Sequence, residues 1–454
     1  MTTVAAISTP YGKGGVALIR ITGEDAIAIA QKVAIRTGKR TLSDALSATA
    51  VRVTFEDGGI PFDDGLATVF RAPRSFTGED VVELCCHGGI LVTQKLLGAV
   101  FTAGAFPAGP GEFTRRAFQN GKLSLSQAEA VGGLIDAKSD KYLTVSLLQC
   151  RGALSEKLQR LCDKLRFLIA SVYAFIDYPD EDMTDVTVEE MKERLTAICG
   201  EVQTLCDSHA YGKAISEGIP VCILGKPNTG KSALLNALAR EDRAIVTAIP
   251  GTTRDVVKEQ IRLGDLLLNL SDTAGIRESK DVVERLGIER SLRSLEEAEL
   301  VLAVFDGSRP FDEEDREVLR LIRDHGKEEQ TVYLLNKGDL PEAEGVRSSL
   351  PKAPVCISAM EKTGLDALEA AVKERFAHTE TDSLGEIVVG ARQFAALTKA
   401  RGYLQDALRT LEGFSQDMAG LDMENALQAL EEVDGKTASD EIVSEIFSHF
   451  CVGK

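Results

Sequence analysis

One segment of the sequence carries residues whose types and spacing could hold a phosphate chain. In IPVCILGKPNTGKSALLNA, residues 219–237, Gly225, Gly230, Lys231 and Ser232 satisfy the spacing Gly-x4-Gly-Lys-Ser. The segment follows an apolar strand and opens a helix, so backbone N–H groups of the loop can face the phosphates. Lys231 can reach the β- and γ-phosphates, and the Ser232 hydroxyl can ligate Mg²⁺. We therefore expect a nucleoside triphosphate site here.

A second group of residues predicts which base this site accepts. Asn336-Lys337-Gly338-Asp339 follows a buried apolar run, and Ser358-Ala359 follows the next one. The Asp339 carboxylate can accept from both guanine N1–H and the guanine 2-amino group, whereas adenine offers no such pair of donors. The sequence therefore predicts a GTP site, with Ser358, Ala359 and Met360 in the second base-contacting loop.

Two further motifs predict how the γ-phosphate is sensed. GTTRD, residues 251–255, supplies a threonine for Mg²⁺; we expect Thr253, with Thr252 as the alternative. DTAGI, residues 272–276, follows an apolar strand and has the Asp-x-x-Gly form. Many GTPases place Gln after this glycine to orient the attacking water, but here the residue is Ile276. Another group must then position the water.

Glu284, in DVVERLG, is the best local candidate for that group, because a carboxylate can polarise water directly or through a second water. A solvated charge on a helix is the alternative interpretation. Asn228, inside the phosphate loop, has a carbonyl that could help hold a monovalent cation. Arg254 and Arg277 could instead stabilise the developing charge, although surface arginines are common.

Composition bounds the class of protein. The 454 residues suffice for roughly three domains of ~150 residues. The net charge of −18 opposes broad nonspecific binding of nucleic acid, so an RNA partner would need a local basic patch or a second protein. Nine cysteines without Cys-x-x-Cys spacing predict reduced thiols in a cytoplasm, and CCHGG (85–89) favours a glycine turn over a metal site. No apolar run reaches the ~20 residues of a membrane span, and we see no signal or transit peptide.

The N-terminal region, residues 1–120, predicts an α/β domain. A helix is expected at 88–104, closed by Gly104. GKGG (12–15) resembles a phosphate loop but precedes a strand, so we read it as a turn. The expected strands cover 16–21, 48–58, 66–72 and 79–89.

The remaining regions predict a G domain inserted into a helical domain. Residues 121–217 and 381–454 have helical periodicity, with Ser124 or Ser126 as the first N-cap. Residues 218–380 alternate strands with helices, which predicts the doubly wound, mainly parallel sheet of a P-loop GTPase. Neighbouring termini would let such a domain be inserted with little disruption. An independent C-terminal helical domain is the alternative.

Long segments beyond the nucleotide motifs resemble a known family. PGEFTRRAFQNGKLSLSQAEAVGGLIDA (110–137) and the ending IFSHFCVGK (446–454), with GKPNTGKS, GTTRD, DTAG and NKGD, resemble the MnmE (TrmE) family of tRNA modification GTPases over essentially the whole chain. The resemblance implies an N-terminal folate-binding domain that also dimerises, a helical domain and an inserted G domain. It implies a homodimer that joins the FAD protein MnmG in a heterotetramer-type complex. That complex would modify C5 of the wobble uridine of certain tRNAs with an aminomethyl- or carboxymethylaminomethyl-type group.

The resemblance also implies roles for individual residues. GTP hydrolysis would be activated when two G domains meet with potassium bound, and Glu284 would be the catalytic carboxylate. The expected potassium ligands are Asn228, Thr247, Ile249 and Thr252. A folate of the 5,10-methylene- or 5-formyl-tetrahydrofolate type is expected at Arg20, Glu83, Lys122 and Lys454. A carboxylate suits the pterin N–H donors, and the cations suit its oxygen or glutamate tail.

Cys451, near the end of the chain, could take part in the chemistry or be a packed structural thiol. The full set of residues expected to contact GTP and its ions comprises Asn228, Thr229, Gly230, Lys231, Ser232, Thr247, Ala248, Ile249, Pro250, Gly251, Thr252, Thr253, Asp272, Thr273, Ala274, Gly275, Asn336, Lys337, Asp339, Ser358, Ala359 and Met360.

Two other functions compete with GTP-driven tRNA modification. One is a GTP-controlled switch in ribosome assembly, and the other is a folate-binding structural partner with a vestigial GTPase. The segments 110–137 and 446–454 favour GTP-driven tRNA modification, because a ribosome-assembly switch would not need them.

Overall fold

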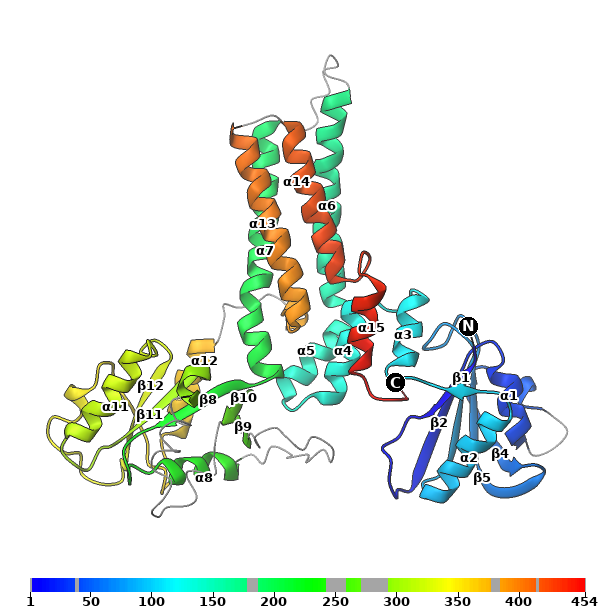
Figure 1. Cartoon of the computed structure of the whole chain (residues 1–454), viewed down its shortest axis with the longest axis horizontal. Helices are drawn as coiled ribbons and strands as arrows, with labels where there is room; N and C mark the ends of the chain where they lie inside the picture. Colours follow the sequence, from blue (N-terminus) through cyan, green and yellow to red (C-terminus); the bar gives the residue numbers. More distant parts are fainter. Residues whose placement is uncertain are drawn as a thin grey trace. The chain divides into compact units, whose positions relative to one another are not determined.

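The computed structural model describes residues 2–36, 41–177, 187–241, 259–270, 293–376, 384–413 and 416–453 (Figure 1). The chain forms two compact units. One comprises Met1–Gly132, Cys150–Arg166 and Leu427–Lys454, and the other comprises Gly133–Gln149 and Phe167–Ala426. None of the helices in the described part combines the length and apolar content that a bilayer crossing demands.

A seven-stranded sheet in the order β3-β4-β5-β6-β2-β1-β7 organises the start of the chain. Its pairs are antiparallel except for β1 with β7. Helices α1 and α2 pack against it over a buried core. The elements are β1 (Val4–Ile7), β2 (Val16–Thr22), α1 (Ala26–Val33), β3 (Ala34–Arg36), β4 (Thr49–Asp57), β5 (Ile60–Phe70), β6 (Val81–His87), α2 (Ile90–Thr102) and β7 (Phe106–Pro107).

The period of two along β2 and β6 divides this sheet into two faces. Ile19, Ile21 and Leu84 join the core under the helices. Arg20 and Glu83 alternate with them and are directly opposite one another in the β2–β6 register, on the other face. Strand pairing thus brings together two residues that lie far apart in the sequence.

Helices supply most of the remaining structure before and after the G domain. Their bounds are α3 (Glu112–Gln119), α4 (Leu125–Asp136), α5 (Asp140–Cys150), α6 (Ala153–Asp177), α7 (Val188–Ser216), α13 (Ala391–Gly413), α14 (Gln416–Val433) and α15 (Asp440–Ser448). Ser124 is the N-cap of α4: its Oγ accepts from Gln127 N at 3.2 Å, and its own N–H donates to Gln127 Oε1 at 2.8 Å. Ser126 instead donates to the Val433 carbonyl. The reciprocal bonds satisfy two N–H groups at the start of the helix.

The second sheet has the order β13-β12-β11-β8-β10-β9 and is parallel except for the β9–β10 pair. Its elements are β8 (Ile219–Leu224), α8 (Lys231–Glu241), β9 (Glu259–Leu263), β10 (Leu266–Leu270), β11 (Leu300–Asp306), α11 (Glu313–Asp324), β12 (Thr331–Asn336), β13 (Val355–Cys356) and α12 (Leu365–Phe376). The predicted fold class, α/β and helical parts with a doubly wound P-loop domain, is confirmed.

Both faces of this parallel sheet are buried, which explains its continuous apolar strands. Along β11, Leu300, Leu302 and Val304 enter one core with residues of α8 and α12. Val301 and Phe305 enter the other, with Ile322 of α11. Because β8, β11 and β12 pair in parallel, their carboxyl ends lead into loops at the same edge of the sheet (Figure 1). This is the edge where α/β domains bind ligands.

Candidate functional site: the nucleotide loops and the Arg20–Glu83 pair

The phosphate loop needs backbone conformations that favour glycine. Gly225, Asn228 and Gly230 have φ values of 154°, 64° and 96°. A Cβ on Gly225 would lie 2.4 Å from the Val304 carbonyl oxygen, so only glycine lets the loop pass this close to β11. The tight turn connects β8 to α8, as the sequence predicts.

Lys231 already lies inside this loop. Its Nζ donates to the carbonyl oxygens of Gly225 at 2.7 Å and Lys226 at 2.8 Å. Burial lowers the pKa of the Lys231 ammonium, because desolvation disfavours its charge. An anionic phosphate is the ligand that would compensate this burial most directly.

Lys226 occupies a variable position of the Gly-x4-Gly-Lys-Ser motif, and its side chain anchors the loop to α11. Its Nζ donates to Asp312 at 2.5 Å and to Asp315 at 2.7 Å. The same two aspartates form a capping box at the start of α11, where the Asp312 side chain accepts from Asp315 N. Burial acts to lower the pKa of Lys226, but the two carboxylates outweigh it and raise the pKa.

The Asn336 side chain connects the phosphate loop to the base-binding loops. It is 2% exposed, its Nδ2 donates to the Thr229 carbonyl at 2.8 Å, and its Oδ1 accepts from Ala359 N at 3.0 Å. Buried polar groups of this kind are costly unless paired. One amide therefore fixes three loops relative to each other.

The Asp339 carboxylate is exposed and held from one side. Ser358 Oγ donates to its Oδ1 at 2.5 Å, and Glu361 N donates to the same hydroxyl at 3.1 Å. Met360, beside this loop, is exposed. The arrangement presents the carboxylate at the end of β12, where it can accept from two N–H donors of a guanine.

Asp306 at the end of β11 was not expected from the motifs. Its Oδ2 accepts from Lys337 Nζ at 2.6 Å, and its Oδ1 accepts from Ser308. Burial acts to raise the Asp306 pKa, but bonds from Lys337 and Ser308 prevail and hold it below its ordinary value. The sequence did offer a signal for Asp306, because a carboxylate at the carboxyl end of a buried parallel strand lies at the edge where α/β domains bind ligands.

The described part of the G domain thus brings together the predicted residues Asn228 to Ser232, Asn336, Lys337, Asp339 and Ser358 to Met360. The other predicted nucleotide and ion contacts lie outside the described residues: Thr247, Ala248, Ile249, Pro250, Gly251, Thr252, Thr253, Asp272, Thr273, Ala274, Gly275 and Glu284.

The second predicted site centres on Arg20 and Glu83. The guanidinium donates through Nε and Nη2 to Glu83 Oε1, at 3.0 and 2.7 Å. Its carbon lies 5.6 Å from the ring centroid of Phe113 and 6.0 Å from that of Phe76. Only one Glu83 oxygen is used by Arg20, so the pair retains acceptor capacity for a ligand.

Three other predicted residues have different outcomes. Lys122 Nζ donates to the Pro73 carbonyl at 3.1 Å, in the loop that carries Phe76. Lys454 lies outside the described residues. Cys451 is exposed, and its carbonyl accepts from Gly111 N at 3.3 Å.

The sequence CCHGG belongs to β6 and the loop that follows it. His87 pairs with Asp63 through Nδ1 at 2.6 Å, and burial raises the pKa of the Cys86 thiol to about 11. GKGG is a loop whose Gly14 N–H donates to the Gly88 carbonyl. All nine cysteines are free thiols.

The doubly wound sheet, the phosphate loop and the Asn-Lys-Gly-Asp segment at the end of β12 are the features of a P-loop GTPase. Family profiles described as "GTP-binding protein TrmE N-terminus" and "MnmE helical domain" match residues 3–122 and 125–451. The chain belongs to the MnmE family of tRNA modification GTPases.

Two relatives, from Geobacter metallireducens and Symbiobacterium thermophilum, agree with this assignment. The chain is 41% identical over 464 residues to the tRNA modification GTPase MnmE of Geobacter metallireducens, covering 100% of this chain and 99% of the relative. It is 43% identical over 461 residues to that of Symbiobacterium thermophilum, covering 100% and 99%. A solved structure of Era from Aquifex aeolicus with GDP and AlF4⁻ is 29% identical, with a TM-score of 0.28, and the match covers 40% of this chain and 65% of that one.

Replacing Asn336 by Ala should weaken GDP binding by about tenfold, or about 1.4 kcal/mol. The substitution leaves the Thr229 carbonyl and the Ala359 N–H unpaired, so the loops lose their common anchor. Titration with a fluorescent GDP measures the effect. Asn236→Ala, at an exposed position of α8, is the control; equal affinities of the two variants would contradict the role of Asn336.

Replacing Asp339 by Asn should lower GTP affinity at least about a hundredfold, because one of the two acceptors becomes a donor. The same change should improve binding of xanthosine triphosphate, whose ring carries a carbonyl where guanine has its amino group. Competition titrations with both nucleotides measure the exchange. Asp324→Asn, an exposed carboxylate ending α11, should alter neither; preserved GTP preference at Asp339→Asn would refute the base assignment.

Proposed function

We propose that this GTPase requires potassium and couples GTP hydrolysis to modification of C5 of a wobble uridine in certain tRNAs. It acts as a cytoplasmic homodimer with the FAD protein MnmG and uses a tetrahydrofolate as one-carbon donor. The observation that carries the proposal is the presence, in one chain, of a GTP site organised by Asn336 and of the separate Arg20–Glu83 pair. Family membership supports the link to tRNA.

Asn228 fits the role of a potassium ligand. It is exposed, with a φ of 64°, whereas the next residue, Thr229, is completely buried and donates to the Lys226 carbonyl. This leaves the Asn228 carbonyl free of the packing that fixes its neighbour. Thr247, Ile249 and Thr252 are proposed to complete the site. A monovalent cation there supplies positive charge near the β–γ bridge, where negative charge grows as the bond breaks.

Magnesium is proposed to be held by the hydroxyl groups of Ser232 and Thr253. Ser232 lies in the first turn of α8, directly after Lys231. Oxygen donors beside a phosphate loop are the ligands that Mg²⁺ takes in such sites. Glu284 is proposed to position the attacking water, since Ile276 offers no polar atom.

The Arg20–Glu83 pair fits a folate. The carboxylate can accept from the amino group and ring N–H of a pterin, and the guanidinium can donate to its oxygen. Lys122 and Lys454 are proposed to bind the same ligand, through its oxygen or glutamate tail. These residues are proposed to bind and orient the one-carbon donor. Cys451 is proposed as a candidate for direct participation in the modification chemistry.

Because the chain has a net charge of −18, MnmG is proposed to contribute to tRNA binding. Phosphates are held mainly by Lys and Arg, so a strongly acidic chain gains from a partner that supplies cations. Dimerisation of the G domains is proposed to complete the potassium site, so that hydrolysis resets the position of the two domains.

GTP turnover at equal ionic strength should be faster in potassium than in sodium, and Glu284→Ala should slow it by about a hundredfold or more. Asn228→Ala should remove the preference for potassium, whereas Glu317→Ala, at an exposed position of α11, should change neither quantity. Nucleoside analysis of tRNA from cells carrying only the Glu284→Ala chain should show unmodified wobble uridine. Equal GTP turnover in potassium and in sodium would contradict the potassium mechanism. Intact wobble-uridine modification in the Glu284→Ala cells would contradict the coupling of modification to GTP hydrolysis.

A further inference from the structure

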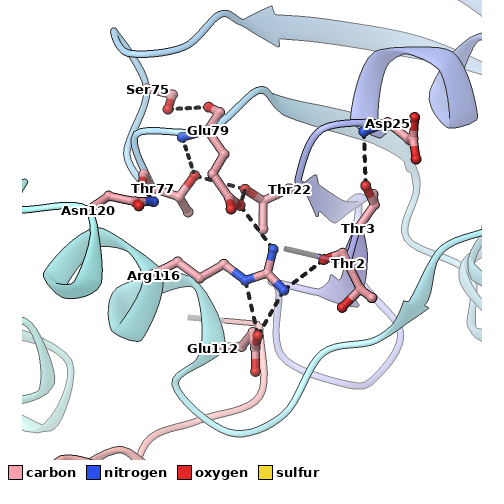
Figure 2. A network of polar contacts seen from close by, with 10 residues as sticks. All are labelled: Thr2, Thr3, Thr22, Asp25, Ser75, Thr77, Glu79, Glu112, Arg116 and Asn120. Carbon is pink, nitrogen blue, oxygen red and sulfur yellow. Dashed lines mark hydrogen bonds and ion pairs between the residues drawn. The ribbon is translucent and has the colours of Figure 1, made fainter.

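The loop at residues 71–80 is held in place by a buried cation. Arg116, on α3, is 3% exposed. Its Nη1 donates to Glu79 Oε2 at 2.9 Å, its Nε and Nη2 donate to Glu112 Oε1 at 3.0 and 2.9 Å, and its Nη2 also donates to the Thr2 carbonyl at 2.9 Å (Figure 2). The guanidinium therefore links the loop, the helix and the start of the chain.

Further hydrogen bonds extend the network along the same loop (Figure 2). Thr22 Oγ1, from β2, lies 3.1 Å from Glu79 Oε2 and 2.8 Å from Thr77 Oγ1. Ser75 Oγ donates to the Glu79 carbonyl, and Asn120 Nδ2 donates to the Thr77 carbonyl at 2.7 Å. The loop is thus fixed from a strand and a helix at several points.

Such a network is a poor source of stability alone. A buried ion pair gains little over well-packed apolar side chains, because both charges lose their hydration. Two carboxylates on one guanidinium leave the cluster with a formal charge of −1. A network of this kind does, however, determine one arrangement of the groups it joins.

What the network positions is an aromatic ring beside the Arg20–Glu83 pair. Phe76 lies within the loop, contacts the Arg20 guanidinium and is 42% exposed. Phe113 packs near the same guanidinium but is completely buried. Lys122 reaches the loop at the Pro73 carbonyl. Phe76 therefore presents its exposed area beside Arg20, in the loop that Lys122 also reaches.

The geometry points to Phe76 as a wall of the folate site and to Arg116 as the positioning residue that holds this wall. This inference rests on the proposed folate function. A pterin is a planar aromatic ring system. The exposed Phe76 ring beside the Arg20 guanidinium offers the stacking contact that such a ring favours. Glu83 and Arg20 would fix the polar edge of the ligand, and Phe76 would cover its apolar surface.

The absence of tryptophan from the sequence allows a direct test in the full-length protein. Phe76→Trp introduces a single indole, whose emission should change when 5-formyl-tetrahydrofolate binds. Tyr11→Trp, at an exposed aromatic position of the same unit, is the matched control and should respond less. Phe76→Ala should raise the Kd measured by calorimetry by about tenfold, within the range of aromatic stacking on a planar base.

The positioning role of Arg116 is tested by variants that loosen the loop. Glu79→Gln and Asn120→Ala should each raise the folate Kd several-fold at a temperature far below unfolding, with GTP turnover unchanged. Glu431→Gln removes the partner of another partly buried arginine, Arg166, and should leave the folate Kd unchanged. A purely structural network would lower the melting temperature of the Glu79 variant without altering the Kd of the folded protein.

The outcomes separate this inference from the function on which it rests. If the unsubstituted protein fails to bind the folate, or if Glu83→Gln binds it as tightly, the proposed folate site is wrong and the inference falls with it. If Glu83→Gln loses binding while Phe76→Ala retains it, only the aromatic wall is refuted. If Phe76→Ala weakens binding while Glu79→Gln and Asn120→Ala do not, only the positioning role of Arg116 is refuted.

Discussion

The nucleotide site depends on the two hydrogen bonds of one buried amide. Asn336 donates to the phosphate loop and accepts from the loop after β13, so the segments predicted to contact phosphate and base share an anchor. Both partners are backbone groups that would otherwise be buried without a bond, which makes the arrangement costly to break. The positions of Lys231 and Asp339 follow from it, since each belongs to a segment that the amide holds.

The two candidate sites share a structural device. In each, one cation placed between two carboxylates fixes a loop: Lys226 between Asp312 and Asp315, and Arg116 between Glu79 and Glu112. The cation comes from the loop in one case and from a helix in the other. In a chain with an excess of 18 negative charges, acidic partners are plentiful, so one cation can be shared by two of them.

The sequence predicts those features whose cause is local. The continuous apolar run of β11 and the glycine requirement of the phosphate loop can be read from neighbouring positions, and Ser124 is one of two caps that the pattern allows. The short helix α1 and the two-residue strand β7 were not predicted, because so few residues show no clear period.

Pairings between distant segments were harder to foresee. Nothing near Lys226 indicates that Asp312 and Asp315 are its partners, and Arg116 cannot be distinguished from Arg115 by its surroundings in the sequence. Arg20 and Glu83 were proposed together through the family resemblance, and the β2–β6 register gives the physical reason for their contact. Tertiary structure decides such pairs, whereas local patterns only supply the candidates.

The glycine at position 230 is constrained by more than the phosphates. A Cβ there would lie 2.1 Å from Asn336 Nδ2, so a side chain would displace the amide that reaches Thr229. The phosphate-loop motif, through Gly230, and the Asn-Lys-Gly-Asp motif, through Asn336, are therefore coupled by direct steric contact. A substitution at either position would require a compensating change at the other. A chain that kept Asn336 but replaced Gly230 would lose the hydrogen bond between Asn336 and the Thr229 carbonyl even without a bound nucleotide.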